Sequence, residues 1–252
     1  MLKNLPRTLA LSGTALFLLY PLWGLAAPIG HWRWGAAGVS SALATSFALT
    51  GVALAIVVAV GTPLAFSLRG APPAARLSFE AVVLLSVLMP PLALGLLLAL
   101  AFGPATALGD LLLHLGIPTS NDPVAFVVTQ VYASLGYYLL GAQAAFEAVP
   151  RELEQSAALL GLAPREVLWR ITLPLARLGL AAALSLAWVR ALGEFGAIMV
   201  TAYYPHGIPV QLWVDLQDQG LPAVLPLLLV FLLTALPLPW ALRILVRVRG
   251  HA

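Results

Sequence analysis

Residues 147–174 read EAVPRELEQSAALLGLAPREVLWRITLP, a charged stretch between two long apolar runs. The flanking runs, 123–146 and 176–199, are each long enough to cross a membrane, because about 20 apolar residues span the hydrocarbon core of a bilayer. A charged, helix-patterned segment between two such runs is well suited to contact a soluble partner. We therefore expect a membrane protein with an exposed cytoplasmic loop at 147–174.

The composition supports this class of protein. Hydrophobic residues make up 61% of the 252-residue chain and charged residues only 9%, whereas about a quarter of the residues of a globular protein are charged. The chain has no cysteine, which excludes disulfides, thiolate metal sites and cysteine nucleophiles. The sequence predicts a single all-α transmembrane domain over 1–252.

Windows of about 20 apolar residues predict six transmembrane helices. Their expected ranges are 9–27, 45–68, 79–102, 123–146, 176–199 and 221–245. Prolines and glycines interrupt several of these windows, so bent helices are expected, with or without a role in gating. Two segments between the windows, 108–115 and 203–220, are expected to lie at the outer membrane surface.

The basic residues predict the orientation. With the N-terminus inside, eleven of the thirteen lysines and arginines fall on the cytoplasmic side, Arg33 falls outside, and Arg190 lies within a span. This bias predicts that both termini are cytoplasmic in a multi-pass plasma (inner) membrane protein. The first window also permits a cleaved signal peptide, because Lys3 and Arg7 precede an apolar run that ends in small residues.

Several catalytic chemistries are excluded. A phosphate-binding loop of the form GxxxxGK needs a lysine, and Lys3 is the only one in the chain. The four histidines are scattered without metal-binding spacing, and no GxSxG nucleophile motif is present. ATP hydrolysis would have to come from another polypeptide.

The 147–174 loop itself is patterned as two helices. Pro150 suits the first position of a helix from about 150 to 160, Gly161 suits the position after its end, and Pro164 can start a second helix that ends at Pro174. Small residues at 156–158 and 161 allow another surface to approach closely. A docking loop and a hairpin that rests on its own membrane domain both remain open at this point.

The loop resembles a known signature. Permease subunits of ATP-binding-cassette importers carry Glu-Ala-Ala, three residues, Gly, nine residues, Ile, one residue and Leu-Pro. Gln155 stands at the glutamate position, with Glu154 before it, and Ser156 replaces the first alanine. The positions to which the resemblance assigns ATPase coupling are Glu154, Gln155, Ser156, Ala157, Gly161, Ile171, Leu173 and Pro174.

The resemblance implies a type I importer permease fold and a set of partners. These are a second permease copy, two cytoplasmic ATP-binding subunits and an extracytoplasmic substrate-binding protein, with membrane lipid around the helices and no nucleic acid. It implies no cofactor in this chain, with ATP and magnesium bound by the partner ATPase. The chain itself would be non-catalytic.

A second stretch indicates the substrate branch. The sequence RALGEFGAIMVTAYYP at 190–205 is similar to oxyanion permeases. Its first half is shared with sulfate permeases, and the Ala-Tyr-Tyr-Pro continuation favours molybdate or tungstate. A sulfate importer remains the alternative within this family.

The same stretch holds the pathway candidates Arg190, Glu194 and Phe195. An ionisable residue within a span is a functional candidate by default. Arg190 and Glu194 are four residues apart, so an ion pair within one helix is also expected. Structural pairing is favoured over substrate contact, because the pair cancels the charge that an oxyanion would seek.

Two other classes of membrane protein fit the sequence less well. A self-contained proton-coupled carrier could use Glu80, Arg190 and Glu194 to relay charge, but it would not need a docking loop. An intramembrane hydrolase lacks the nucleophile and metal patterns that its chemistry requires.

Overall fold

The computed structural model describes residues 5–25 and 38–235, and in these ranges every regular element is a helix. The elements before the loop are α1 (Leu5–Leu19), α2 (Val39–Ser67), α3 (Pro73–Leu88), α4 (Pro91–Phe102), α5 (Ala107–His114) and α6 (Pro123–Glu147). Those that follow are α7 (Arg151–Leu159), α8 (Pro164–Val167), α9 (Leu173–Leu192), α10 (Gly196–Thr201), α11 (Ile208–Gln219) and α12 (Leu221–Ala235). A short 3-10 turn, η4 (Leu68–Gly70), continues α2.

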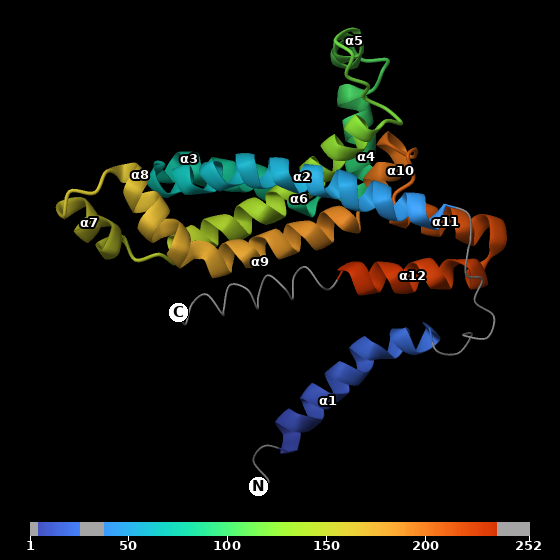
Figure 1. Cartoon of the computed structure of the whole chain (residues 1–252), viewed down its shortest axis with the longest axis horizontal. Coiled ribbons are helices and arrows are strands. Elements are labelled where there is room, and N and C mark those ends of the chain that lie inside the picture. The colour runs from blue at the N-terminus through green and yellow to red at the C-terminus, as the bar shows by residue number, and fades with distance from the viewer. Residues whose placement is uncertain (1–4, 26–37, 236–252) are drawn as a thin grey trace.

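The centre of the molecule is a bundle in which α2, α3 and α9 pack against α6 (Figure 1). Small residues make the α6–α9 crossing. A Cβ atom added to Gly141 would lie 2.7 Å from the Cβ of Ala183, and one added to Gly179 would lie 2.4 Å from the Cβ of Ala145. Close contact of this kind holds helices together in lipid, where burial of apolar surface gives no driving force between them.

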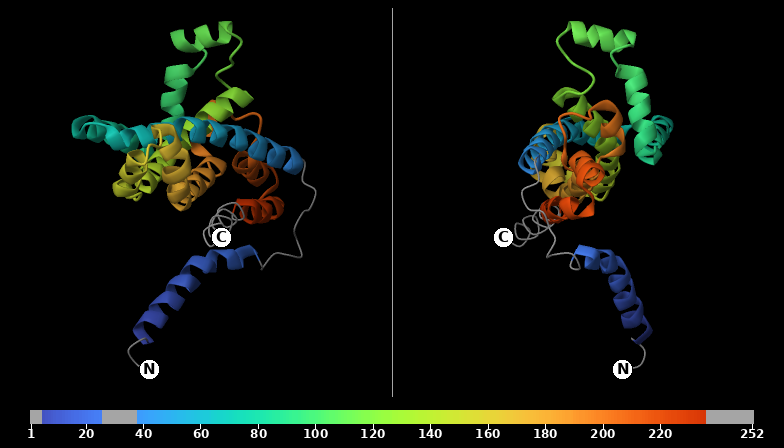
Figure 2. Two further views of the ribbon diagram at one scale, coloured as in Figure 1. Left: turned by 60° about the vertical axis from the view of Figure 1, so that its left-hand side comes forward. Right: turned by 90° about the vertical axis from the view of Figure 1, so that its right-hand side faces the viewer.

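The bundle has two distinct ends. Figure 1 shows α7 and α8 at one end and α10 and α11 at the other, and α12 packs against α11. Figure 2 shows that α1 and the α4–α5 arm leave the bundle on opposite sides. All four aspartates of the chain lie in or beside α5, α6 and α11, toward the α10–α11 end: Asp110, Asp122, Asp215 and Asp218.

Three helices in the described residues are long and apolar enough to cross a membrane: Val39–Gly70, Pro123–Glu147 and Pro164–Leu192. They correspond to the second, fourth and fifth expected spans. The first and sixth expected spans are represented by shorter apolar helices, Leu11–Leu25 and Leu221–Ala235, and parts of both spans lie outside the described residues. The count of six spans therefore stays a prediction.

The third expected span, 79–102, is broken in the structure, in line with the bent helices expected where prolines interrupt a window. The structure has α3 and α4 there, bent from one another by 111°. The break falls at Pro90 and Pro91, which lack the backbone N–H that a helix needs. Met89, before the first proline, takes an extended backbone with ψ of 126°, as a residue before proline prefers. The two helices α3 and α4 count as one span only if that span is broken at this bend.

Two helix ends also differ from expectation. The fifth expected span, 176–199, is interrupted in the structure: α9 ends at Leu192 and α10 begins at Gly196. The second loop helix was expected to end at Pro174, but it continues through a π-helical turn, Leu168–Thr172, into α9. In that turn Leu173 N–H bonds to Leu168 C=O, five residues back. The wider winding accommodates Pro174, which has no backbone N–H to donate.

The two segments expected at the outer surface are both helical, as α5 and α11. The expectation that the second one lies at the outer membrane surface stays a prediction, and the protein itself covers one of its faces. Ile208, Val210, Gln211 and Asp215 of α11 are buried, and α11 packs against α2 and α12. Ile208, Gln211 and Asp215 lie on one face of the helix, and two of these three are polar, so no apolar pattern in the sequence marks the buried face.

Candidate functional site

The most exposed turn of the described loop joins α7 to α8, and Gly161 makes that turn possible. Its φ of +87° lies in the left-handed region that glycine adopts at little cost. Leu162 N–H bonds to Ala157 C=O at 3.2 Å, and Gly161 N–H bonds to Ala158 C=O at 3.0 Å. This pair of bonds is a Schellman motif, which satisfies carbonyls at the end of α7. The predicted helix end at Gly161 is confirmed.

The second helix begins at Pro164, as predicted. Its first turn is closed by Glu166, whose Oε2 accepts a hydrogen bond from Ala163 N–H at 3.1 Å. The acidic side chain also suits the positive end of the helix dipole. The elbow, defined here as residues 151–172, therefore consists of two helices set by glycine and proline.

The tip of the elbow is apolar and exposed. Leu159 is 89% exposed and Leu160 is 82% exposed, and a Cβ atom added to Gly161 would meet nothing within 4 Å. Trp169, on the following helix, is 62% exposed. Large apolar side chains on a surface with charged neighbours mark a contact site for another molecule.

The remaining signature residues divide between the two faces of the elbow. Ala157 is buried, Ile171 and Leu173 are half-buried, and Val167, which lies on the same side, is buried. Gln155, Ser156 and Pro174 are exposed. The elbow thus rests on its own bundle by one face and offers the other face to its surroundings.

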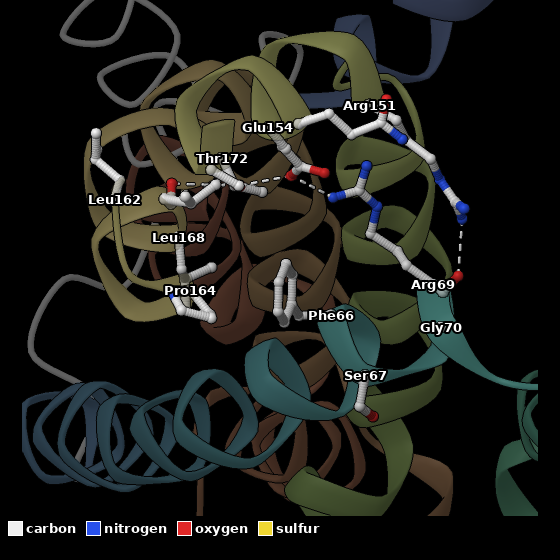
Figure 3. Close-up of a pocket in the computed structure, with 13 residues that line it drawn as sticks. Phe66, Ser67, Arg69, Gly70, Arg151, Glu154, Leu162, Pro164, Leu168 and Thr172 are labelled. Carbon is white, nitrogen blue, oxygen red and sulfur yellow. Dashed lines mark hydrogen bonds and ion pairs between the residues drawn. The ribbon is translucent and has the colours of Figure 1, made fainter. Parts of the chain in front are cut away.

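Glu154 belongs to the inner face (Figure 3). Its Oε1 accepts a hydrogen bond from Arg69 Nη1 at 2.7 Å and another from Thr172 Oγ1 at 2.6 Å. The structure therefore directs this carboxylate toward the bundle, whereas the signature resemblance assigns it to the face that contacts an ATPase. Arg69 and Thr172 were missed at the sequence level, because neither carries a motif.

A cavity of about 540 Å³ lies behind the elbow. Figure 3 shows Phe66 between the end of α2 and the elbow. The lining comes from η4 and the end of α2 on one side and from α7, α8 and the π turn on the other. Over part of the length of the elbow, the cavity therefore separates it from the end of α2.

At the other end of α9, the three pathway candidates lie at the break before α10. Arg190 and Glu194 form the expected ion pair, and the Glu194 side chain is 0% exposed. Glu194 Oε1 also accepts a hydrogen bond from Ala197 N–H at 2.8 Å. The Phe195 ring lies 5.9 Å from the ring of Trp213 in α11.

A buried polar network beside this break was not foreseen. Gln130 Nε2 donates to Thr50 Oγ1 and to Ala191 C=O, each at 2.9 Å, and so links α2, α6 and α9. Thr129 and Thr201 share a 2.7 Å hydrogen bond between α6 and α10. A polar residue within an apolar window was the available signal, since such side chains join helices in a membrane.

Within residues 5–25 and 38–235, no cluster of three or more His, Cys, Asp or Glu side chains could hold a metal ion. The arrangement offers docking at the elbow and close helix packing at the α9–α10 break.

A family model described as "Binding-protein-dependent transport system inner membrane component" matches residues 51–249. A probable molybdenum ABC transporter permease protein of Haloferax volcanii is 38% identical over 175 residues, which cover 69% of this chain and 64% of that relative. The molybdenum transport system permease protein ModB of Mycobacterium tuberculosis is 30% identical over 238 residues, or 90% of each chain. A molybdate/tungstate transport system permease protein, WtpB of Pyrococcus abyssi, is 27% identical over 180 residues, covering 71% of this chain and 67% of that relative.

The fold has solved neighbours. A bacterial alginate ABC transporter, solved in complex with a periplasmic protein bound to an alginate pentasaccharide, matches with a TM-score of 0.74 over 95% of this chain and 93% of its own. The sequences are 16% identical, so this similarity concerns the fold.

Proposed function

The chain belongs to the family of inner membrane components of binding-protein-dependent transport systems, and we propose that it is the membrane-spanning permease subunit of an ATP-driven importer of molybdate or tungstate. Permeases of this family are non-catalytic, so a separate ATPase would bind ATP and magnesium and supply the energy.

The observation that carries the proposal is the exposed apolar tip of the elbow. Leu159 and Leu160 would be costly to leave in water, and the glycine beside them lets another backbone approach. A helix set in a partner's groove buries such a surface. We infer that the groove belongs to the ATPase, because the elbow carries the family signature.

The proposed assembly has two copies of this permease, two ATPase subunits and an external binding protein that delivers the anion. ATP binding closes the ATPase pair, and each elbow follows the subunit in which it is docked. The helices that continue from the elbow then move, and the central cavity of the dimer changes from inward-facing to outward-facing. This sequence follows the general logic of two states biased by a ligand.

The proposed orientation places the α7–α8 end in the cytoplasm, together with both termini. Arg69, Arg76, Arg151, Arg165, Arg170 and Arg177 all lie in or next to the elements of that end. Short segments rich in arginine stay on the cytoplasmic side. The aspartates then lie toward the outer surface, where the binding protein would dock.

The substrate proposal rests on the relatives that carry molybdenum or molybdate/tungstate in their names. The pairing of Arg190 with Glu194 leaves little net charge at the α9–α10 break. We therefore propose that Arg190, Glu194 and Phe195 shape the pathway by packing, and that the external binding protein supplies most of the selectivity.

The docking role is tested with two substitutions at one position. Gly161→Ala and Gly161→Trp share the cost of a side chain at a positive φ, but only tryptophan adds bulk at the tip. A candidate ATPase, sought in the neighbouring reading frames, would be co-expressed and co-purified with each variant. We expect alanine to retain the ATPase and tryptophan to lose it. Retention of ATPase and transport by the tryptophan variant would contradict the docking role.

The class and the substrate are tested in proteoliposomes. Uptake of labelled molybdate, tungstate and sulfate would be measured with the whole assembly and internal or external ATP, and separately with this chain alone under a proton gradient. We expect uptake of molybdate or tungstate only with the ATPase and ATP. Uptake by the isolated chain under a proton gradient would instead support the carrier, and preference for sulfate would reassign the substrate.

A further inference from the structure

Arg69 lies where three parts of the chain meet. It follows α2 in the η4 turn, and its side chain is only 9% exposed. Its Nη1 donates to Glu154 Oε1 in α7 at 2.7 Å, and its Nη2 donates to the Val149 carbonyl between α6 and α7 at 3.1 Å. In return, Arg151 Nη2 donates to the Arg69 carbonyl at 2.8 Å. The end of α2 is thus hydrogen-bonded to the segment just before α7 and to the first turn of α7.

One carboxylate oxygen extends this link to α9. Glu154 Oε1 accepts from Arg69 and also from Thr172 Oγ1, at 2.6 Å. Thr172 is 1% exposed and lies in the π turn that leads directly into α9. A single oxygen atom of the elbow therefore joins the ends of two membrane-length helices, α2 and α9 (Figure 3).

The link is narrow, because the cavity of about 540 Å³ lies next to it. Phe66, Arg69 and Gly70 line the α2 side of that cavity, and Ala158, Leu162 and Leu168 line the elbow side. Across the cavity the two surfaces do not pack together. A movement of the elbow can therefore be absorbed by the cavity unless the polar link passes it on.

We propose that the Arg69–Glu154–Thr172 link is the positioning element that makes α2 follow α7 and the start of α9 when the ATPase closes. This inference rests on the proposed function. A partly buried ion pair is a weak source of stability but specifies geometry well. Arg69 suits the role because its planar guanidinium forms directed bonds with two acceptors at once.

The experiment measures the number of ATP molecules hydrolysed per anion imported by the full assembly in proteoliposomes. Arg69→Met removes the hub of the link and leaves the exposed tip unchanged. We expect this variant to co-purify with the ATPase as the unaltered chain does, and to hydrolyse about tenfold more ATP per anion imported. Arg76→Met is the matched control: Arg76 is bonded to Glu80 and Glu147, between α3 and α6, and we expect its ratio to be unchanged.

Two further variants keep the proposal testable if Arg69→Met folds poorly. Thr172→Val removes one donor to Glu154 and leaves the ion pair, so we expect the ratio to rise by about threefold. Exchanging the charges, with Arg69→Glu and Glu154→Arg together, should restore part of the coupling that either single change removes.

The outcomes separate this inference from the proposed function. If the unaltered chain does not bind the ATPase, the proposed function fails. If it binds, and Arg69→Met or Thr172→Val imports with the unaltered ratio, the link does not transmit movement. An equal rise in Arg76→Met would also overturn the inference, because it would show a general effect of charge loss at this end.

Discussion

The two ends of α9 can be compared through the glutamate that each one holds. Glu194, at the α10 end, is fully buried and bonds to Arg190 four residues before it and to Ala197 N–H three residues after it. Glu154, at the elbow end, is 20% exposed and bonds to Arg69 and Thr172, which are 85 and 18 residues away. The first carboxylate fixes a local break, and the second one connects separate helices.

This difference predicts different consequences of losing each charge. At the break, loss of Glu194 leaves the Arg190 side chain without its carboxylate partner. At the elbow, loss of Glu154 would leave Arg69 its hydrogen bond to the Val149 carbonyl, beside a cavity at the end of the bundle. We therefore expect stability to depend on the first site and energy coupling to depend on the second one.

The largest effect on stability is expected from Glu194→Ala. It leaves Arg190 without its carboxylate at a site where that side chain is only 19% exposed, and breaking a buried pair in this way costs about 3–5 kcal/mol. The free energy of unfolding would be measured in mixed micelles by titration with denaturing detergent.

The control for this variant is the double change of Arg190→Met with Glu194→Leu. Replacing both charges by apolar side chains of similar size should recover much of the loss. A double variant as unstable as Glu194→Ala would show that the Ala197 N–H contact, rather than the ion pair, stabilises the break.

A smaller effect is expected from Gly196→Ala at the same break. The new Cβ atom would lie 2.8 Å from the Cβ of Pro91 and 3.0 Å from the backbone nitrogen of Leu92. Overpacking against a neighbouring helix costs about 1–3 kcal/mol, and the same unfolding titration would detect it.

Gly51→Ala in α2 is the matched control, because an added Cβ atom there meets nothing within 4 Å. Alanine favours a helix over glycine by about 0.5–1 kcal/mol, so this variant should be as stable as the unaltered chain or more so. Equal stability of the Gly196→Ala and Gly51→Ala variants would mean that α4 and α10 are not tightly packed in the membrane.

The sequence was informative where local chemistry decides the structure. Three predictions that depend on residues only a few positions apart are confirmed. They are the helix end at Gly161, the helix start at Pro164 and the Arg190–Glu194 pair. The inward direction of Glu154 depends on the position of Arg69, just after α2 and 85 residues earlier in the chain. A local sequence pattern cannot predict a contact between residues so far apart in the chain.

The direction of Glu154 agrees with the face of α7 on which it lies. Glu154 lies three residues before Ala157, so the two share a face of α7, and Ala157 is buried.

The bend between α3 and α4 is a case in which the sequence predicts the place but not the geometry. Pro90 and Pro91 predict a break, but the 111° angle comes from the packing of α4 on α10.

The smallest effect on stability is expected from Arg170→Gln at the elbow. Arg170 Nη2 lies 3.3 Å from Glu166 Oε1, and the two side chains are 69% and 44% exposed. An exposed pair four residues apart on a helix contributes only about 0.3–0.5 kcal/mol, because water and salt screen it. The change in the free energy of unfolding of the isolated permease should therefore be at the limit of detection, and addition of salt should remove it.

A loss above about 1 kcal/mol would mean that this face of the elbow is covered in the isolated permease, by lipid or by a second copy. In that case the exposed tip would no longer be free to receive an ATPase, and the contrast between the open elbow and the packed break of α9 would disappear.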